Sequence, residues 1–270
     1  MSTDLQDRLE RELTQCLRDV GRYQMQQRGR ALAVSDKADT SPVTEVDLYS
    51  HRLIKAALLD LEPHTPILSE ESSQLTDFTI ANCERFWCID PLDGTRDYIE
   101  GTDHFAINVA LFVQGQVEWA MIYHPASEEF LVADRATHRV YFVGADGHKN
   151  PVTLPLQSPH IRAVLTSARV SMNDQRKEQI RSFAQHLADD ARIVPISSSY
   201  KFFLLLKNEA QAYVRKAPCM IWDIAPGFLA AELAGMHIVD LKNLMSFTWP
   251  MRALDVIPSF AITMARGDLS

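Results

Sequence analysis

Asp90-Pro91-Leu92-Asp93-Gly94-Thr95 is the most informative stretch of this chain. It follows Phe86-Trp87-Cys88-Ile89, an apolar run that predicts a short buried strand. The two carboxylates therefore leave the carboxyl end of a strand, where α/β folds place their binding sites. Pro91 restricts one backbone angle, and Gly94 permits a tight turn with a ligand close to the main chain. Such a segment can hold a hard metal ion and a phosphate oxygen, although Asp-x-x-Asp-Gly is also a common polar turn.

The composition is that of an ordinary globular protein. The chain has 270 residues, of which 46% are hydrophobic and 23% charged, and a formal net charge of −8. Binders of nucleic acids or anionic membranes normally carry a basic face, so we expect neither as a partner. We expect no signal peptide and no membrane span, because no apolar run is long enough. The spacing of the four cysteines, Cys16, Cys83, Cys88 and Cys219, forms no zinc pattern. We expect them to be reduced thiols of a cytoplasmic protein.

The first 150 residues predict helices followed by an antiparallel meander. Apolar residues at helical spacing from Leu5 to Val20 predict an amphipathic helix. A second helix begins after Thr44, which resembles an N-cap with Asp47 one turn later, and the polar segment 34–43 between the helices predicts a mobile loop. Period-two patterns then predict four successive strands, over 105–113, 117–123, 130–133 and 140–143.

The rest of the chain predicts alternating strands and helices. The turn-rich segment 144–159 predicts a boundary, so we expect an N-terminal α+β part, 1–150, and a C-terminal α/β part, 151–270. Strands are expected over 163–166, 193–194 and 212–214, and helices over 180–187, 201–206 and 223–233.

Three further acidic positions belong beside the opening motif on chemical grounds. Glu70 follows the predicted strand 66–68, whereas Asp47 and Asp223 begin helices, a place that the helix dipole alone makes favourable for an acid. If Glu70, Asp90, Asp93 and Asp223 converge, their repulsion costs stability unless cations bind. Oxygen-only ligation favours magnesium or manganese over zinc. Two such ions suit the hydrolysis of a phosphate ester by water attacking in line.

Three motifs, in this order and at these spacings, resemble the inositol monophosphatase superfamily: Glu70-Glu71, Asp90 to Thr95, and Trp222-Asp223-Ile224-Ala225. The likeness extends from Ser41 to Gly235. It implies the fold of the inositol monophosphatases and fructose bisphosphatases, a sandwich of alternating helix and sheet layers. It also implies a magnesium-dependent, lithium-sensitive phosphomonoesterase that acts on a small phosphorylated substrate, as a monomer or a homodimer.

The resemblance assigns the metal ligands residue by residue. Glu70, Asp90 and the carbonyl oxygen of Leu92 would hold one magnesium ion. Asp90, Asp93 and Asp223 would hold a second, and Glu70 would share a third, weakly bound ion. Manganese is the expected substitute for magnesium.

The same resemblance assigns the catalytic groups. Thr95, backed by Asp47, would orient and deprotonate the attacking water, beside the catalytic carboxylate of Glu70. The backbone N–H groups of Gly94 and Thr95 would bind the phosphate.

The substrate is suggested by a narrower likeness. Ser197 to Phe202 resembles the Gly-Ser-Ser-Leu-Lys-Phe segment of bacterial 3'(2'),5'-bisphosphate nucleotidases, and Ala212 to Arg215 resembles their Leu-Tyr-Pro-Arg. We therefore expect Ser198, Lys201 and Arg215 to contact substrate, because the second phosphate of such a nucleotide needs a cationic receptor. Most lysines and arginines are instead solvated surface cations.

Some positions depart from the nucleotidase pattern. Ser197 stands for a glycine, Pro226 for an alanine in the first part of a helix, and 167–171 lacks the Ser-Arg-Ser-His sequence. Despite these departures, the likeness to the nucleotidases implies a phosphatase of 3'-phosphoadenosine 5'-phosphate or its phosphosulfate. The alternatives are an inositol-1-phosphatase or broad sugar-phosphate phosphatase of the same fold, and a non-catalytic binding or regulatory protein. The intact acidic set argues against the last.

Overall fold

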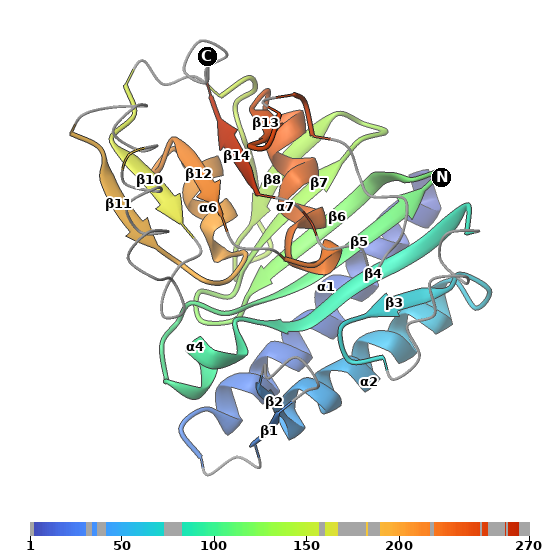
Figure 1. Ribbon diagram of the computed structural model, residues 1–270. Helices are drawn as coiled ribbons and strands as arrows, with labels where there is room; N and C mark the ends of the chain where they lie inside the picture. Colours follow the sequence, from blue (N-terminus) through green and yellow to red (C-terminus); the bar gives the residue numbers. More distant parts are fainter. Residues whose placement is uncertain are drawn as a thin grey trace.

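The described residues are arranged in four layers, helix, sheet, helix and sheet (Figure 1). This computed structural model describes residues 3–30, 34–36, 42–72, 83–156, 160–166, 182, 190–216, 219–243, 245–247, 257 and 259–264. The layered α+β sandwich expected from the motifs is confirmed. Among the described residues, no helix has the length and apolar character needed to cross a membrane.

The first sheet has seven strands in the order β3-β4-β5-β6-β7-β8-β9, and the second has five in the order β11-β10-β12-β14-β13. The helices within the described ranges are α1 (Thr3–Gln27), α2 (Glu45–Leu61), α4 (Thr95–Ile99), α6 (Tyr200–Leu206) and α7 (Ile221–Leu233). The strands of the first sheet are β3 (Ile67–Ser69), β4 (Arg85–Asp93), β5 (Ala106–Val113), β6 (Gln116–His124), β7 (Glu129–Asp134), β8 (Arg139–Val143) and β9 (Lys149–Pro151). Those of the second are β10 (Ala163–Thr166), β11 (Arg192–Pro195), β12 (Ala212–Arg215), β13 (His237–Asp240) and β14 (Phe260–Thr263).

The two faces of the first sheet are covered by different helices. Side chains alternate along each strand, so neighbouring residues of one strand enter different cores. Trp87 and Ile89 of β4 belong to the core on the α1–α2 side, together with Leu13 and Ile54. Cys88, between them in sequence, belongs instead to the core that contains α6 and α7. The predicted meander β5 to β8 is confirmed, and each of its strands pairs antiparallel with the next.

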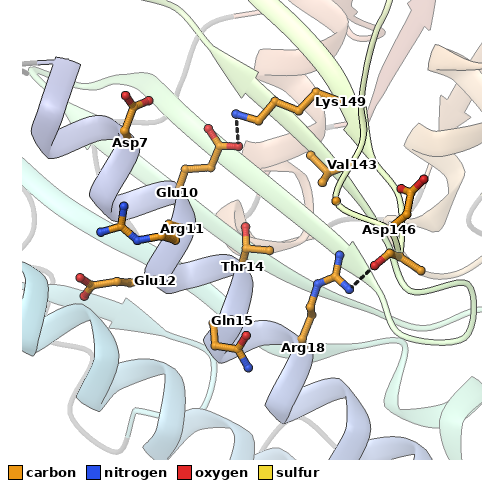
Figure 2. A pocket seen from close by; sticks show the side chains of 12 residues that line it. Asp7, Glu10, Arg11, Glu12, Thr14, Gln15, Arg18, Val143, Asp146 and Lys149 are labelled. Atoms are coloured by element: carbon orange, nitrogen blue, oxygen red, sulfur yellow. Dashed lines mark hydrogen bonds and ion pairs between the residues drawn. The ribbon is translucent and has the colours of Figure 1, made fainter.

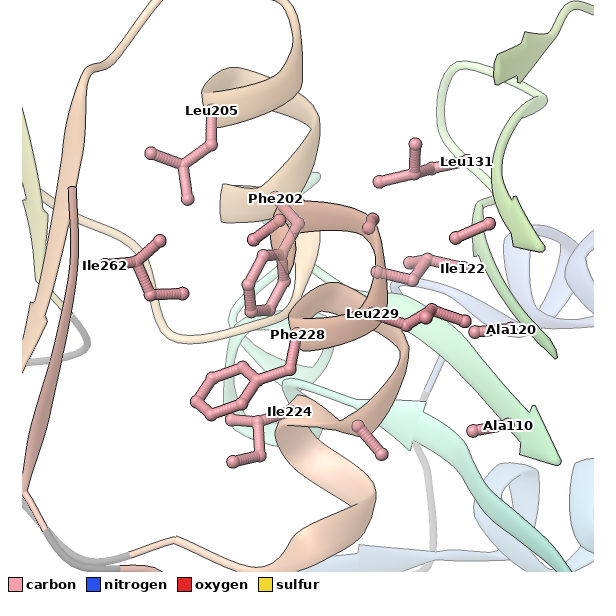
Figure 3. Packing of buried hydrophobic residues seen from close by; sticks show 14 of the residues in the cluster. Ala110, Ala120, Ile122, Leu131, Phe202, Leu205, Ile224, Phe228, Leu229 and Ile262 are labelled. Atoms are coloured by element: carbon pink, nitrogen blue, oxygen red, sulfur yellow. The ribbon is translucent and has the colours of Figure 1, made fainter. Parts of the chain in front are cut away.

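A single hydrophobic core joins the two sheets through α6 and α7 (Figure 3). Ile224 and Phe228 of α7 lie in this core, and Gly227 allows α6 to come close. A Cβ atom at Gly227 would lie 2.1 Å from the ring of Phe202, so only glycine fits there. This packing fixes the first turn of α7 above the carboxyl end of β4.

Several predicted boundaries differ from the structure. The segment 34–43, expected to be a loop, contains β1 (Val34–Asp36) and β2 (Pro42–Thr44), which pair antiparallel; pairing between two short segments has no local sequence signal. The second sheet is mixed, because β14 pairs antiparallel with both β12 and β13. The helix expected over 180–187 lies almost wholly outside the described residues. The division at residue 150 stays a prediction.

Candidate active site

The carboxylate cluster begins where β3 and β4 run side by side. These strands are parallel, with Ser69 opposite Ile89. The backbone N–H of Glu70 donates to the carbonyl of Ile89 at 3.3 Å, which continues the pairing one residue further. Glu70 and Asp90 are the next residues after the paired Ser69 and Ile89, and they therefore lie beside each other. Parallel pairing thus brings together two carboxylates that are 20 positions apart in sequence.

A bulge in β4 turns Asp93 toward the same face of the sheet as Asp90. The sequence predicted a strand that ended at Ile89, but β4 continues to Asp93. Asp90 pairs with Asn108 and Asp93 pairs with Ala106, so three steps along β4 match two steps along β5. Residues 106 and 108 share one face of β5 because side chains alternate. The extra residue therefore places both aspartates on the face that α7 covers.

Helix α7 supplies the third carboxylate of the cluster from its first turn. Asp223 is the third helical residue, and its Oδ2 accepts a hydrogen bond from the backbone N of Met220 at 3.0 Å. One carboxylate oxygen each of Glu70, Asp90 and Asp223 lies within 4.8 Å of the others. This all-oxygen set fits a hard divalent cation such as magnesium.

Asp93 lies next to this cluster and is held by neutral donors. Its Oδ2 accepts hydrogen bonds from the backbone N of Ser199 and from Asn108 Nδ2, the latter at 3.3 Å. Its negative charge raises the pKa of Asp223. Oδ1 receives no hydrogen bond within the described part of the chain, which leaves one carboxylate oxygen for another ligand.

Burial raises the pKa of Asp223 to about 7 in the metal-free protein, and the charges of Asp93 and Glu70 add to that effect. Two interactions oppose it, the positive charge of Arg215 and the hydrogen bond from Met220. Arg215 Nη2 lies 3.7 Å from Asp223 Oδ2. Bringing these carboxylates together is therefore costly without a cation, as their sequence pattern predicted.

The turn after β4 presents Thr95 to Asp47. Gly94 has φ +92°, and a Cβ atom there would lie 2.8 Å from the carbonyl oxygen of His104 and 3.0 Å from Ser198 Cβ. Thr95 Oγ1 lies 3.0 Å from Asp47 Oδ1 and 3.1 Å from the carbonyl oxygen of Leu92. The buried Asp47 also closes the capping box of α2 by accepting from the backbone N of Thr44 at 2.8 Å. The predicted pairing of Thr95 with Asp47 is thus present.

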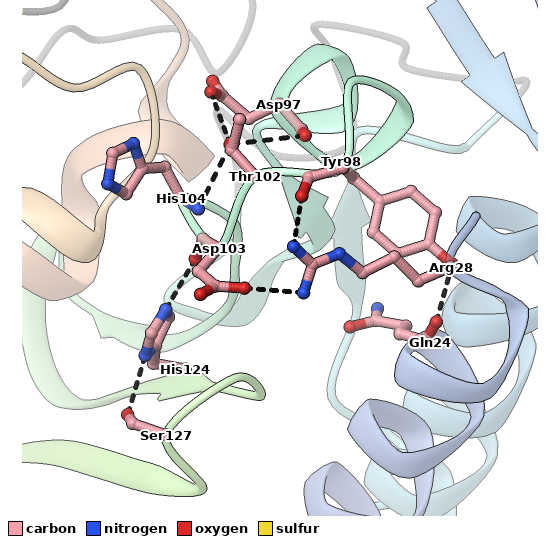
Figure 4. Close-up of polar contacts among 10 residues, drawn as sticks. Gln24, Arg28, Asp97, Tyr98, Thr102, Asp103, His104, His124 and Ser127 are labelled. Atoms are coloured by element: carbon pink, nitrogen blue, oxygen red, sulfur yellow. Dashed lines mark hydrogen bonds and ion pairs between the residues drawn. The ribbon is translucent and has the colours of Figure 1, made fainter.

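Helix α4 and the loop after it are anchored to α1 (Figure 4). The hydroxyl of Tyr98 donates to the backbone carbonyl of Gln24 at 2.7 Å, and Arg28 pairs with Asp103 at 2.6 Å. Gln24 Nε2 also donates to the carbonyl of Pro91 at 2.9 Å. These bonds fix the main chain of the acidic motif from the side opposite α7.

The three residues expected to contact substrate lie in different surroundings. Ser198 is buried beside Gly94. Lys201 is only 1% exposed, and its ammonium group donates to the carbonyl of Ser197 at 3.1 Å and lies 5.0 Å from the centre of the Tyr213 ring. Arg215 is half-buried against Asp223. Their contact with substrate stays a prediction.

Two buried amides at the site, Asn108 and Gln24, were missed from the sequence. Asn108 interrupts the otherwise apolar run Phe105 to Val113, and that interruption is a signal for a polar contact in the core. Gln24 lies on the buried side of an amphipathic helix, where its neighbours are apolar. A buried amide must find partners, so both positions carried information about the site.

A separate hollow of about 800 Å³ lies between α1 and the β8–β9 turn (Figure 2). Lys149 pairs with Glu10 at 2.7 Å on one side of it, and Arg18 donates to the carbonyl of Ala145 at 2.8 Å on the other. Glu70, Asp90, Asp93 and Asp223 are not among the residues that line this hollow.

Comparisons with known proteins converge on one family. Residues 5–258 match the model of the inositol monophosphatase family. The 3'(2'),5'-bisphosphate nucleotidase CysQ of Escherichia coli K12 is 31% identical over 234 residues, which cover 85% of each chain. The crystal structure of CysQ from Bacteroides thetaiotaomicron superposes with a TM-score of 0.70 at 25% identity, over 85% of this chain and 88% of that one. A solved inositol monophosphatase/NADP phosphatase complexed with Mg²⁺ and phosphate has a TM-score of 0.71 at 19% identity, with coverages of 97% and 92%.

Proposed function

The chain belongs to the inositol monophosphatase family, and from that premise we propose that it hydrolyses the 3'-phosphate of a nucleoside 3',5'-bisphosphate. The expected substrates are 3'-phosphoadenosine 5'-phosphate and its phosphosulfate. The protein is an enzyme, a metal-dependent phosphatase. The observation that carries the phosphatase chemistry is the convergence of Glu70, Asp90 and Asp223 within 4.8 Å, and the similarity to CysQ supports the nucleotide substrate.

Glu70, Asp90 and the Leu92 carbonyl would hold one magnesium ion, and Asp90, Asp93 and Asp223 a second, with Glu70 sharing a third. When bound, these ions offset the negative charge of the phosphate and of the attacking and leaving oxygens. The donor set supports this assignment because it consists of oxygen atoms, the ligands that magnesium prefers.

The residues of the chain then orient the reaction. The Thr95 hydroxyl donates to Asp47 Oδ1, so Thr95 Oγ1 would take a proton from the attacking water as its own proton passes to Asp47. Asp47 is held in turn by Thr44, so the pair keeps one orientation. The backbone N–H groups of Gly94 and Thr95 would bind the phosphate where the chain turns into α4.

The second phosphate would be received by cations of the C-terminal part. Arg215 is the better placed, because its guanidinium group is half-buried beside the carboxylate cluster. Lys201 would act mainly through its charge, since its ammonium group is enclosed by Ser197 and Tyr213. Ser198 lies against Gly94 and would line the turn that binds the phosphate.

Side-by-side turnover of 3'-phosphoadenosine 5'-phosphate, inositol 1-phosphate and fructose 1,6-bisphosphate, each with and without magnesium, tests the proposal. We expect activity only with magnesium, inhibition by lithium, and the largest kcat/KM for the nucleotide. Arg215→Met should raise KM for the nucleotide by about tenfold, the loss of one charge-assisted contact, and change KM for inositol 1-phosphate less. Lys216→Met, which removes the neighbouring cation, is the matched control.

A preference for inositol 1-phosphate would overturn the nucleotide assignment and leave the phosphatase chemistry intact. Activity that does not depend on a divalent ion would overturn the metal assignment itself. The four free cysteines agree with the proposed cytoplasmic location.

A further inference from the structure

Asn108 is a fully buried amide at the centre of the carboxylate site. It lies in β5 opposite Asp90, on the face that α7 covers, and it is 0% exposed. Its side chain makes three contacts: Nδ2 lies 3.3 Å from Asp93 Oδ2 and 3.1 Å from the Trp222 carbonyl oxygen, and Oδ1 accepts from Ser199 Oγ at 2.6 Å. A carboxylate and a carbonyl can only accept, so the two N–H groups must face them.

The contact with Trp222 compensates for a proline in α7. In a regular helix the N–H of residue 226 donates to the carbonyl of residue 222. Pro226 lies inside α7 and has no N–H, so the Trp222 carbonyl loses this partner. The Asn108 amide supplies a donor to that carbonyl instead. Trp222 immediately precedes Asp223, so this bond ties β5 to the turn that carries a carboxylate of the cluster.

The second contact of the Asn108 amide is with the carboxylate of Asp93. Ser199 and Asn108 both donate to Asp93 Oδ2, and Ser199 also donates to Asn108. The three groups form a closed ring of hydrogen bonds that holds the carboxylate in one rotamer. Hydrogen bonds to a metal-binding carboxylate fix its orientation, and their loss typically weakens metal binding 10-fold to 100-fold.

We propose that Asn108 is a positioning residue, which sets the separation of Asp93 and Asp223 by bonding Asp93 and the Trp222 carbonyl with one planar amide. No other uncharged side chain of this size offers two donors and an acceptor in one plane. The inference rests on the proposed metal site, because it acts through Asp93. It predicts that Asn108 affects magnesium binding in the absence of any substrate.

Magnesium binding to Asn108→Ser, measured by calorimetry without substrate, tests the first contact. We expect the dissociation constant of the weakened site to rise about 10-fold to 100-fold. The matched control is Gln211→Ser, which removes a buried amide just before β12 whose Oε1 accepts from the backbone N of Arg162 at 2.8 Å. Gln211→Ser should lower the melting temperature and leave magnesium binding unchanged.

A double-mutant cycle with Asp93→Asn separates positioning from a general structural effect. Since Asn108 bonds Asp93 directly, Asn108→Ser should lower magnesium affinity less in the Asp93→Asn background than in the parent protein. An equal loss in both backgrounds would overturn the inference. If Asp93→Asn itself leaves magnesium binding unchanged, the proposed metal site is wrong, which is a distinguishable result.

The helical contact is tested by melting temperature in a second cycle. Pro226→Ala restores an N–H to the Trp222 carbonyl, so Asn108→Ser should lower the melting temperature less, by about 2 °C or more, in that background. Equal shifts in the two backgrounds would contradict the compensation. Should Asn108→Ser fail to fold, Ser199→Ala removes the hydroxyl that donates to Asn108 Oδ1, and unchanged magnesium binding in that variant would count against the inference.

Discussion

The two halves of the active site are built in different ways. The segment Asp90 to Thr95 is organised largely by itself: the Leu92 N–H donates to Asp90 Oδ1 at 3.0 Å, and Thr95 Oγ1 lies 3.1 Å from the Leu92 carbonyl oxygen. The segments around Ser199 and Asp223 reach the site only through contacts with distant residues. Asn108 bonds Trp222 across 114 positions of the chain.

This difference separates chemistry from specificity. The local half carries residues whose roles follow from a short motif, and its geometry survives as long as β4 and its bulge form. The distant half carries Asp223, Arg215 and Lys201, and their positions depend on the packing of α6 and α7 on the first sheet. We therefore expect substitutions in the first half to affect chemistry, and substitutions in the second to affect substrate preference or the packing that places these residues.

The largest expected effect on activity comes from replacing one central carboxylate in each half, Asp90 in the first and Asp223 in the second. Asp90→Asn removes a ligand shared by both proposed magnesium ions, whereas Asp223→Asn removes a ligand of one and keeps an oxygen acceptor for the Met220 N–H. We expect kcat/KM to fall on the order of 10³-fold or more for Asp90→Asn, several kcal/mol of lost charge stabilisation, and less for Asp223→Asn. Steady-state kinetics over a magnesium series measures both; equal losses would contradict the asymmetry.

Two glycine substitutions compare activity with stability. Gly94→Ala forces a side chain into a left-handed conformation against His104 and Ser198, so activity should fall about 100-fold through displacement of the phosphate turn. Gly227→Ala drives a methyl group into the Phe202 ring and should cost about 1–3 kcal/mol of unfolding free energy. Urea denaturation and kinetics on the same samples give both quantities. A Gly227→Ala protein that is stable but inactive would contradict the proposed division.

The smallest effect is a pH dependence centred on Asp223. Its pKa is raised from 3.8 to about 7 in the metal-free fold, so its contribution to stability is fully present below about pH 4 and is lost as pH rises through 7. Magnesium needs the ionised carboxylate, so affinity should rise about tenfold between pH 6 and pH 8. Calorimetric titrations at several pH values measure this, with Asp223→Asn as the control. A slope that persists in that variant would assign the titration to another group.

The sequence predicted the layered fold and the convergence of Glu70, Asp90 and Asp223. Strand periodicity also predicted β5 to β8 with errors of one or two residues. It missed the β1–β2 pairing and the full length of β4, because the bulge between Asp90 and Asp93 depends on the register with β5. It also missed Asn108 and Gln24, since an isolated amide in an apolar pattern does not indicate which residue it will hydrogen-bond. Lys201 is only 1% exposed, and its expected contact with substrate stays a prediction.

By itself, the sequence determined the chemistry of this protein, because three acidic motifs occur together in the order and at the spacings of one family of metal-dependent phosphatases. Only the tertiary structure decided how those carboxylates are held. A bulge places Asp93 on the face of Asp90, Gly227 lets α6 pack closely on α7, and one buried amide joins Asp93 to the turn before Asp223. The physical reason is that register, close packing and buried hydrogen bonds join residues far apart in the chain, and no local pattern records which residues they join.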